Sequence, residues 1–553
     1  MWKTTTPTLI GHITNIQSDN WTANLLSSGK APDVVRLGNE EILVGQPGSY
    51  VVVRSHGNTL LCMVIETWQD ELPPDQTGER PIRQRIGLAP LGEIGDDMNF
   101  VRGVIHFPVT GAEVHVAEAE HLDSMFLTYE RGAMKVGTLS SRNDVDVFLE
   151  PSVLFSRHLA ILGQSGSGKS WTVTSLLQRV VETMPRAHVI LLDLHGEYCW
   201  TDEDGQMHSA FPEESMRYID ARELEIPYWL LNYEALVELL VDRTDPHAPV
   251  QIAYLRDVLA TLRKKSNPDL AGSDRLAVDS PVYFSLDELY RLFKEANEAY
   301  LDFGKTKGPL NGQFTEFLVK LQSRFNDSRY DFLLRPQNRT SSETLEDLLR
   351  DFVGLGNPKR PITIVDLSPI PSDVRPTVSA QIGRLAFEFN FWNPARRQFP
   401  ILLVCEEAHA YIPRASDKRF DATRRSMERI AKEGRKYGVG LAVVSQRPNE
   451  LSETVLAQCG NYICLRITNP DDQEYVRELV PEGERNLMSL LTTLRRGEAL
   501  ALGEAAPLPT RFMVQTPNPT PNSNDADFKT AWTSGPSDIE VDDIVARWRE
   551  QRR

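Results

Sequence analysis

One short stretch of this sequence combines residues whose types and spacing suit the binding of a nucleotide. The segment GQSGSGKS places Gly163, Gly168, Lys169 and Ser170 in the pattern G-x-x-x-x-G-K-[ST]. Its glycines, Gly166 among them, let the backbone turn so that successive N–H groups point at one anion. In this pattern the lysine reaches the β- and γ-phosphates, and the next hydroxyl ligates Mg²⁺. The motif therefore predicts a nucleoside triphosphate site that uses Mg²⁺.

The flanking residues favour this interpretation over an ordinary glycine turn. The apolar run Leu159–Leu162 precedes the motif, and residues 171–181 have the pattern of a helix. A strand, a glycine-rich loop and a helix in this order form the context that the motif requires. The residues predicted to contact the nucleotide are Gly163, Gln164, Ser165, Gly166, Ser167, Gly168, Lys169, Ser170 and Trp171.

Two carboxylates at the end of a second apolar run predict the hydrolytic half of the site. In residues 400–409, PILLVCEEAH, the apolar residues lead to Glu406 and Glu407. In such a pair the first acidic residue holds Mg²⁺ through its water shell, and the second polarises the attacking water. We expect Glu406, with Ser170, to hold the metal and Glu407 to be catalytic. A surface carboxylate pair would not normally end an apolar run, although the first position is more usually Asp.

Two further predicted strands also end in polar residues. Residues 188–193 read as a buried parallel strand, after which Asp193 and Glu197 either order water or metal, or cap an ordinary turn. Val439–Ser445 reads as another buried strand and is followed by Gln446. Because strand C-termini face the ligand crevice of an open α/β sheet, we expect Gln446 to face the γ-phosphate and report hydrolysis.

A basic run follows the carboxylate pair and admits three interpretations. An Arg of this run could enter a neighbouring subunit's site and stabilise transition-state charge, worth roughly 10³–10⁵ in rate. The run could instead follow a DNA backbone, or it could form a solvated helix face. The nine basic residues, set against four acidic ones, are Arg414, Lys418, Arg419, Arg424, Arg425, Arg429, Lys432, Arg435 and Lys436. The residues that share one helical face are Arg425, Arg429, Lys432 and Lys436.

The sequence pattern changes along the 553 residues and predicts several units. Short β-type runs favour a small N-terminal barrel, with its boundary near residue 150. These runs are 8–16, 41–44, 50–54 and 60–66, with a second β-rich portion at 99–106 and 113–116. Apolar recurrence at three and four residues predicts helices over 233–242, 248–265, 286–299, 314–324 and 343–352. The predicted units are 1–150 (barrel), 151–226 and 356–514 (α/β core), 227–355 (helical insertion) and 515–553 (linker and short helix).

The net charge of −17 argues on its face against a nucleic-acid partner, but its distribution is uneven. Residues 1–150 hold 11 Lys and Arg against 20 Asp and Glu, so over half of the excess charge precedes the nucleotide motif. A basic patch further on is compatible with this composition. Five scattered cysteines lack metal-ligand spacing and fit reduced thiols. Since no apolar run reaches ~18 residues and no signal-peptide core is present, we expect a cytoplasmic protein that is not bound to a membrane.

Several segments in a fixed order carry a resemblance to a known family. They are GQSGSGKS, DLHGEY, IPYWLLN, IVDLS, LLVCEEAHAYIP, EGRKYGVGLAVVSQRP and RRGEALALGEAAPLPTRF. Over residues 1–515 the chain resembles the HerA family of hexameric DNA translocases, within the FtsK–HerA superfamily of P-loop ATPases. Many nucleoside triphosphatases share the first segment, whereas DLHGEY, EEAH and GRKYG…SQRP in this order are much more specific.

The resemblance implies a fold and a set of site roles. The fold is an α/β RecA-like P-loop ATPase core with an N-terminal small β-barrel and an inserted helical subdomain. Lys169 and Ser170 match the ATP and Mg²⁺ residues, Glu407 the catalytic glutamate and Gln446 the polar sensor. Arg435, in GRKYG, is the residue that we expect to reach the adjoining subunit's site.

The resemblance also implies partners. The family's ring would place ATP between the subunits of a homo-hexamer and double-stranded DNA in the central channel. Archaeal members work with the nuclease NurA in DNA-end resection, and bacterial relatives occur with nucleases or sirtuin-like NADases in antiphage defence. We therefore expect an ATP-dependent DNA translocase or helicase with a partner effector. A secretion or conjugation ATPase and a nucleotide-dependent scaffold that activates an effector are the alternatives.

Overall fold

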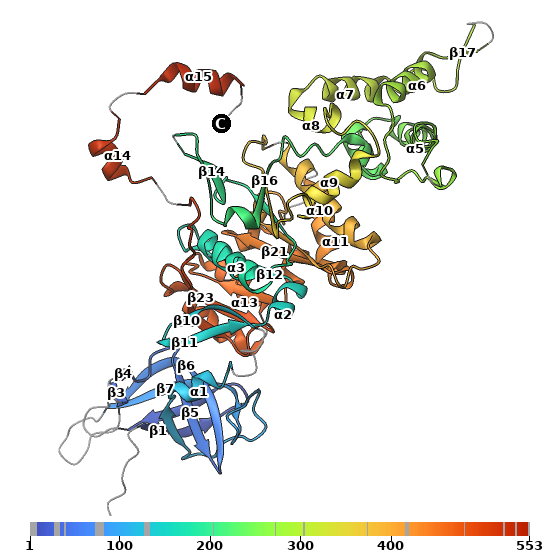
Figure 1. Cartoon of the computed structure of the whole chain (residues 1–553). Helices are drawn as coiled ribbons and strands as arrows, with labels where there is room; N and C mark the ends of the chain where they lie inside the picture. Colours follow the sequence, from blue (N-terminus) through green and yellow to red (C-terminus); the bar gives the residue numbers. More distant parts are fainter. Residues whose placement is uncertain are drawn as a thin grey trace, which may run out of the picture.

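The computed structural model describes residues 8–26, 34–37, 40–71, 82–126, 133–202, 204–270, 272–301, 305–372, 374–414, 420–480, 482–523, 526–536 and 539–550. A β-barrel, a large central sheet and a group of inserted helices follow one another across the molecule, and two C-terminal helices lie apart from them (Figure 1). The predicted fold class is confirmed.

Antiparallel strands form a closed N-terminal barrel, as the short β-type runs predict. The strands follow the order β2-β1-β9-β5-β6-β7, and pairing of β2 with β7 closes the ring. Trp21 and Val53 have no exposed surface and lie in its core. The barrel strands are β1 (Leu9–Ile16), β2 (Trp21–Leu25), β5 (Tyr50–Ser55), β6 (Asn58–Glu71), β7 (Ile82–Ile94) and β9 (Glu113–Val116). Strand β8 (Phe100–Arg102) pairs antiparallel with the end of β7, and β3 (Val34–Leu37) and β4 (Glu40–Leu43) form a separate hairpin.

The structure draws the boundary after the barrel earlier than residue 150. The hairpin of β10 (Met134–Leu139) and β11 (Arg142–Leu149) belongs to the central sheet, where β10 pairs with β24 (Thr510–Val514). A Cβ atom at Gly137 would lie 1.9 Å from the carbonyl oxygen of Met513, so glycine permits this close pairing. No strand is predicted from the sequence over residues 134–149, and the pattern of a single segment does not say which sheet it joins.

The central sheet has 11 strands in the order β11-β10-β24-β23-β22-β12-β21-β20-β13-β19-β16. Neighbours from β22 to β16 are all parallel, whereas β23, β24, β10 and β11 continue the sheet with antiparallel pairs. Continuous apolar runs are typical of parallel strands that are buried on both faces. The bounds are β12 (Leu159–Leu162), β13 (Val189–Asp193), β16 (Met216–Asp220), β19 (Ile362–Asp366), β20 (Ile401–Cys405), β21 (Val439–Ser445), β22 (Asn461–Cys464) and β23 (Glu498–Gly503).

Helices connect these strands and bring the chain back to the start of the next strand. Helix α11 ends at Gly438, whose left-handed backbone (φ 71°) turns the chain directly into β21. The long helices of the core are α3 (Lys169–Thr183), α10 (Arg375–Trp392) and α11 (Asp421–Tyr437). Shorter elements are α1 (Ala119–Asp123), α2 (Pro151–Ser156), α12 (Glu453–Ala457), α13 (Pro470–Leu479) and the hairpin β14 (Cys199–Thr201) with β15 (Met207–Ser209).

The inserted helices pack around a buried aromatic cluster. Phe293 of α6 stacks on Phe317 of α7 with ring centroids 3.9 Å apart. The five predicted helices are confirmed, with ends that differ by at most two residues. They are α4 (Tyr233–Leu240), α5 (Ala248–Lys265), α6 (Leu286–Glu298), α7 (Thr315–Phe325) and α9 (Thr344–Phe352). Helix α8 (Asp331–Leu334) and the two-residue strands β17 (Tyr300–Leu301) and β18 (Thr306–Lys307) complete the insertion.

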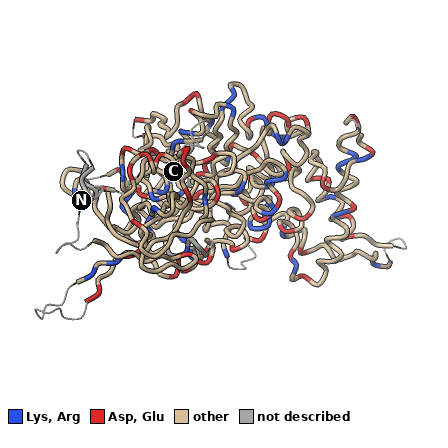
Figure 2. The backbone as a smooth tube through the Cα atoms, turned by 90° about the horizontal axis from the view of Figure 1, so that it is seen from below, with Lys and Arg blue, Asp and Glu red and all other residues tan. Residues whose placement is uncertain are grey.

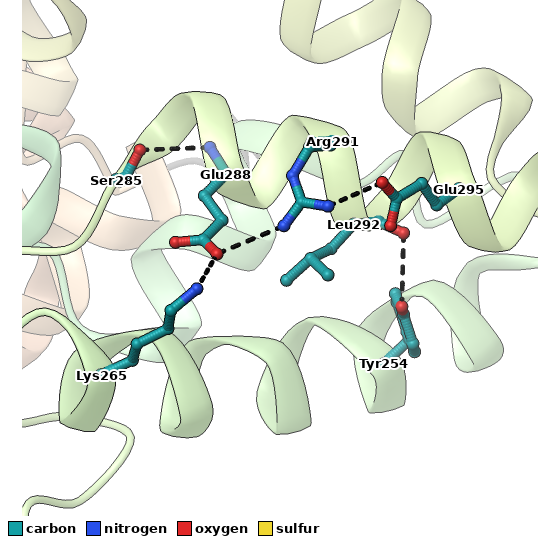
Figure 3. A network of polar contacts seen from close by, with 7 residues as sticks. All are labelled: Tyr254, Lys265, Ser285, Glu288, Arg291, Leu292 and Glu295. Atoms are coloured by element: carbon teal, nitrogen blue, oxygen red, sulfur yellow. Dashed lines mark hydrogen bonds and ion pairs between the residues drawn. The ribbon is translucent and has the colours of Figure 1, made fainter.

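Polar contacts tie the start of α6 to the end of α5 (Figure 3). The Ser285 hydroxyl accepts the N–H of Glu288 at 3.1 Å and caps α6. The Glu288 carboxylate accepts hydrogen bonds from Lys265 of α5 and from Arg291, which also pairs with Glu295. Because exposed ion pairs contribute at most about 1 kcal/mol, the aromatic cluster beneath them stabilises this part more.

Arg324, Arg329 and Tyr330 of the insertion are engaged within the protein. Arg324 donates a 2.6 Å hydrogen bond to the Tyr330 hydroxyl, and its guanidinium lies over the Tyr330 ring. Arg329 pairs with Asp327 at 2.6 Å. These contacts support structural roles for all three residues.

The C-terminal segment contains two short helices, α14 (Phe528–Ser534) and α15 (Val541–Glu550), outside the body of the molecule (Figure 1). Trp532 and Trp548 are 83% and 74% exposed. None of the helices in the described ranges combines the length and the apolarity needed to cross a membrane.

A buried histidine joins three elements of the core. His158 precedes β12 and is 3% exposed. Its Nδ1 accepts the N–H of Leu441 in β21, and its Nε2 lies 3.0 Å from the carbonyl oxygen of Ala431 in α11. One nitrogen must therefore be an acceptor and the other a donor, which is the neutral ring. Burial lowers the pKa of His158, and the charge of Arg435 lowers it further.

We expect His158→Asn to reduce the loss of stability on acidification. Because the folded-state pKa is lowered, the contribution of neutral His158 is present above the ordinary pKa and is lost as the pH falls. The apparent unfolding temperature should therefore fall less in the variant than in the wild type between about pH 7.5 and about pH 5.5. The side-chain oxygen of Asn can still accept the hydrogen bond from the N–H of Leu441. A variant with the wild-type response would contradict this assignment; His12→Asn, in β1, is the control.

Candidate functional site

The phosphate loop has the backbone that its glycines predict. Gly166 and Gly168 adopt φ values of 72° and 108°, in a region that L side chains rarely occupy. A Cβ atom at Gly163 would lie 2.7 Å from the Ser167 hydroxyl and 2.8 Å from Leu465 Cβ. Helix α3 begins directly after Gly168, so its unpaired N–H groups face the loop. The loop is shaped to surround an anion.

Two residues that the sequence analysis did not single out, Thr468 and Gly497, hold this loop in place from neighbouring strand ends. The Gln164 side-chain oxygen accepts the N–H and the hydroxyl of Thr468, at 3.1 and 2.6 Å. On the other side, the N–H of Gly497 donates to the carbonyl oxygen of Ser167 at 3.0 Å. The loop is thus fixed between the segment after β22 and the start of β23.

Lys169 and Glu407, which the sequence assigned to the two halves of one site, lie together. Their Nζ and Oε1 atoms are 3.8 Å apart, and both side chains are largely buried. The residues follow β12 and β20, which flank β21 in the sheet. Glu407 adopts a left-handed backbone (φ 44°, ψ 45°), which is unfavourable by about 1–2 kcal/mol for a residue with a side chain. Such strain is characteristic of functional positions.

Gln446 also reaches the phosphate loop, and a histidine connects Ser445, the residue before it, with Glu407. The Ser165 hydroxyl donates to the Gln446 side-chain oxygen. His409 Nδ1 lies 3.3 Å from Glu407 Oε2 and 3.2 Å from the Ser445 hydroxyl, directly before Gln446. Sequence analysis overlooked His409, although it stands two residues after Glu407 in EEAH.

Glu406 turns toward the loop after β13 and does not contact Lys169. It is 3% exposed, and its Oε1 accepts a 2.9 Å hydrogen bond from the Tyr198 hydroxyl. Burial raises the pKa of the Glu406 carboxyl well above its ordinary value, and the charges of Asp193 and Glu197 raise it further. Its expected place in a Mg²⁺ site stays a prediction.

Asp193 caps the turn that carries Tyr198. Its Oδ1 accepts the N–H groups of His195, Gly196 and Glu197, and its Oδ2 accepts that of Tyr198. Burial raises the pKa of Asp193 to about 6 in spite of these four hydrogen bonds. Of the two roles considered for Asp193, the cap is the one that the contacts support.

Most of the predicted basic face on α11 is engaged in ion pairs. Arg425 pairs with Glu234 and Glu238 of α4, and Arg429 with Glu388 of α10 at 2.9 Å. Acidic and basic residues are interspersed along the chain in Figure 2. The face therefore joins α11 to the insertion and to α10. A contact of the basic run with a DNA backbone stays a prediction. Lys418 and Arg419 lie outside the described residues.

Arg435 lies at the opposite edge of the sheet from the phosphate loop. It lines a cavity with the first residues of three parallel strands, Val189, Ile401 and Val439. The phosphate loop follows the last residue of β12, which is parallel to them. Arg435 is exposed and has no ion pair within the described ranges. It is thus distant from the site of its own chain.

Sequence comparison assigns these features to one family. Residues 134–386 match the description "Helicase HerA, central domain", and residues 398–518 match "Helicase HerA-like C-terminal". The chain belongs to the HerA family. This membership confirms the predicted family and the predicted enzyme class, an ATP-hydrolysing helicase.

Archaeal HerA proteins are similar to this chain over most of its length. The "DNA double-strand break repair helicase HerA" of Sulfolobus acidocaldarius is 28% identical over 446 residues, which are 80% of each chain. Its counterpart from Pyrococcus furiosus is 28% identical over 70% of each chain. Among solved structures, VirB4 of Thermoanaerobacter pseudethanolicus matches with a TM-score of 0.45 and 18% identity, over 69% of this chain and 96% of VirB4.

We expect Tyr198→Phe to destabilise this HerA-family chain, because it leaves a buried Glu406 oxygen unpaired. The loss should be about 1–3 kcal/mol and should lower the apparent unfolding temperature. Glu406→Gln should change that temperature less, since its amide oxygen still accepts from Tyr198.

Tyr290→Phe, which removes a hydroxyl without a described hydrogen bond, is the control. Equal unfolding temperatures for Tyr198→Phe and the wild type would show that the bond to Glu406 does not stabilise the fold.

Proposed function

We propose that this chain hydrolyses ATP to move along double-stranded DNA as a homo-hexameric ring. The observation that carries the proposal is the 3.8 Å approach of Glu407 to Lys169, beside a loop shaped for phosphates. Nucleotide hydrolases require this pairing, in which a cation binds the phosphates and a carboxylate polarises the attacking water. Relatives that are named DNA repair helicases support DNA as the substrate.

In this mechanism each site residue has a defined task. The loop N–H groups and Lys169 bind the β- and γ-phosphates, while Glu407 orients water and accepts its proton. The residues fit a metal nucleotide, since Glu407 Oε2, although 3.3 Å from His409 Nδ1, forms no hydrogen bond with any described residue. Ser170 and, through water, Glu406 would hold Mg²⁺, which neutralises phosphate charge when bound. Gln446, bound to Ser165, would transmit the loss of the γ-phosphate to β21.

The place of Arg435 supports the proposed ring. An unpaired cation at the edge of the sheet opposite its own phosphate loop is suited to a site in the next subunit. There its guanidinium would stabilise charge that develops on the γ-phosphate. DNA would then pass through the channel of the ring. In this arrangement a chain with a net negative charge can act on a polyanionic substrate.

A partner effector completes the proposal. The resemblance to HerA proteins favours a NurA-like nuclease or an antiphage effector such as a sirtuin-like NADase. The N-terminal barrel, with its excess of Asp and Glu, is the proposed docking surface.

ATP hydrolysis by the full-length protein, with and without double-stranded DNA, tests the motor. We expect a six-subunit species whose hydrolysis increases with DNA. Lys169→Ala should lose nucleotide binding, whereas Glu407→Gln should bind ATP but hydrolyse it about 10²–10⁴-fold more slowly. Lys359→Ala, at an exposed site, is the matched control. Hydrolysis that is indifferent to DNA would favour the protein-translocating or scaffold alternative.

Mixing two inactive variants tests the shared site. Arg435→Ala should hydrolyse ATP roughly 10³–10⁵-fold more slowly than the wild type. Rings assembled from equal amounts of Arg435→Ala and Lys169→Ala should regain activity, because about a quarter of their sites combine an intact Lys169 with an intact Arg435. Lys436→Ala, the adjacent cation, should stay active. A mixture no more active than its components would exclude a role for Arg435 in the neighbouring site.

A further inference from the structure

His409 stands beside the Glu407 carboxylate, in the 3₁₀ turn Ala408–Ala410 that follows β20. Its Nδ1 lies 3.3 Å from Glu407 Oε2 and 3.2 Å from the Ser445 hydroxyl, with which it forms a hydrogen bond. The side chains of His409 and Glu407 are only 14% and 12% exposed, and Ser445 has no exposed surface. One ring nitrogen is therefore within reach of two buried partners.

The ring has a single proton to offer to these two partners. Burial lowers the pKa of His409, although the charge of Glu407 raises it, so the ring is neutral at about pH 7 and carries one N–H. The carboxylate attracts that proton to Nδ1, because a lone pair there would face a negative charge. In this structure Nδ1 bonds to Ser445, and Glu407 Oε2 is buried without a hydrogen-bond partner among the described residues.

Lys169 is the cation that the Glu407 carboxylate has beside it in this structure. Its Nζ lies 3.8 Å from Oε1, the other oxygen of Glu407. Phosphates on the loop carry more negative charge than one carboxylate and would draw Lys169 toward themselves. The carboxylate would then lose this attraction, and a buried carboxylate without a partner is unfavourable. His409 Nδ1 is close enough to supply the donor that replaces Lys169.

We propose that His409 is a positioning residue whose Nδ1–H exchanges its hydrogen bond with Ser445 for one with Glu407 Oε2 when Lys169 binds the phosphates. The inference rests on the proposed role of Glu407 in hydrolysis. With Oε2 held by His409, Oε1 is the oxygen that accepts the proton of the attacking water, since it already faces Lys169.

The exchange also connects Glu407 with the end of β21. The Ser445 hydroxyl accepts the N–H of Arg447 at 3.0 Å, and the Ser445 carbonyl oxygen accepts that of Gly163 at 3.2 Å. Ser445 thus contacts the start of the phosphate loop on one side and the residues around Gln446 on the other. Loss of its bond to His409 is the change by which nucleotide binding reaches this segment.

ATP binding and steady-state ATP hydrolysis by full-length variants test the exchange. His409→Ala should bind ATP with a Kd within about threefold of the wild type, while kcat falls about 10²-fold, because only the orientation of Glu407 is lost. His409→Asn places an amide N–H near the position of Nδ1 and should recover most of the activity. The amide of His409→Gln lies farther from the backbone and should not. Ser445→Ala removes the competing partner and should keep kcat at or above the wild-type value.

His12→Ala, at a histidine of β1, is the control and should match the wild type. A wild-type kcat in His409→Ala, or equal losses in the Asn and Gln variants, would overturn the positioning role. A loss in Ser445→Ala as large as that in His409→Ala would overturn the exchange. If Glu407→Gln itself hydrolyses ATP at the wild-type rate, the proposed function fails instead.

A crystal structure of the wild type with a non-hydrolysable ATP analogue and Mg²⁺ gives a direct readout. His409 Nδ1 should lie within about 3 Å of Glu407 Oε2 and beyond hydrogen-bond distance of the Ser445 hydroxyl. An unchanged bond to Ser445, with the analogue on the phosphate loop, would contradict the exchange.

Discussion

The parallel pairing of β12, β21 and β20 is the constraint on which the candidate site depends. Since neighbouring strands run in the same direction, the segments that follow them meet at one edge of the sheet. The phosphate loop follows β12, Gln446 follows β21, and Glu407 follows β20. A register shift of one residue in β20 would turn its side chains to the other face of the sheet and separate Glu407 from Lys169.

The same pairing places the end of α11 at the other edge. A helix that joins two parallel strands must return from the carboxyl edge to the amino edge, and α11 ends at Gly438 immediately before β21. Arg435 therefore lies near the first residues of the parallel strands. Under the proposed function, a complete site combines the carboxyl edge of one subunit with the amino edge of the next. Hydrolysis would then depend on assembly of the ring.

The antiparallel strands connect the site with the barrel. β23 begins next to the phosphate loop, β24 returns past Gly497, and β10 adds the hairpin that follows the barrel. The hairpin that follows the proposed docking surface thus shares one sheet with the phosphate loop.

Local pattern alone determined the phosphate loop, the carboxylate pair, the buried strands and the inserted helices, because residue type and spacing encode each of them over a few turns. The tertiary structure decided which residues meet. It placed Tyr198 against Glu406, His409 between Glu407 and Ser445, and the hairpin 134–149 in the central sheet rather than the barrel. These pairings depend on which strands are neighbours. Hydrogen bonds between segments that are distant in the sequence fix that order, and the periodicity of a single segment does not record it.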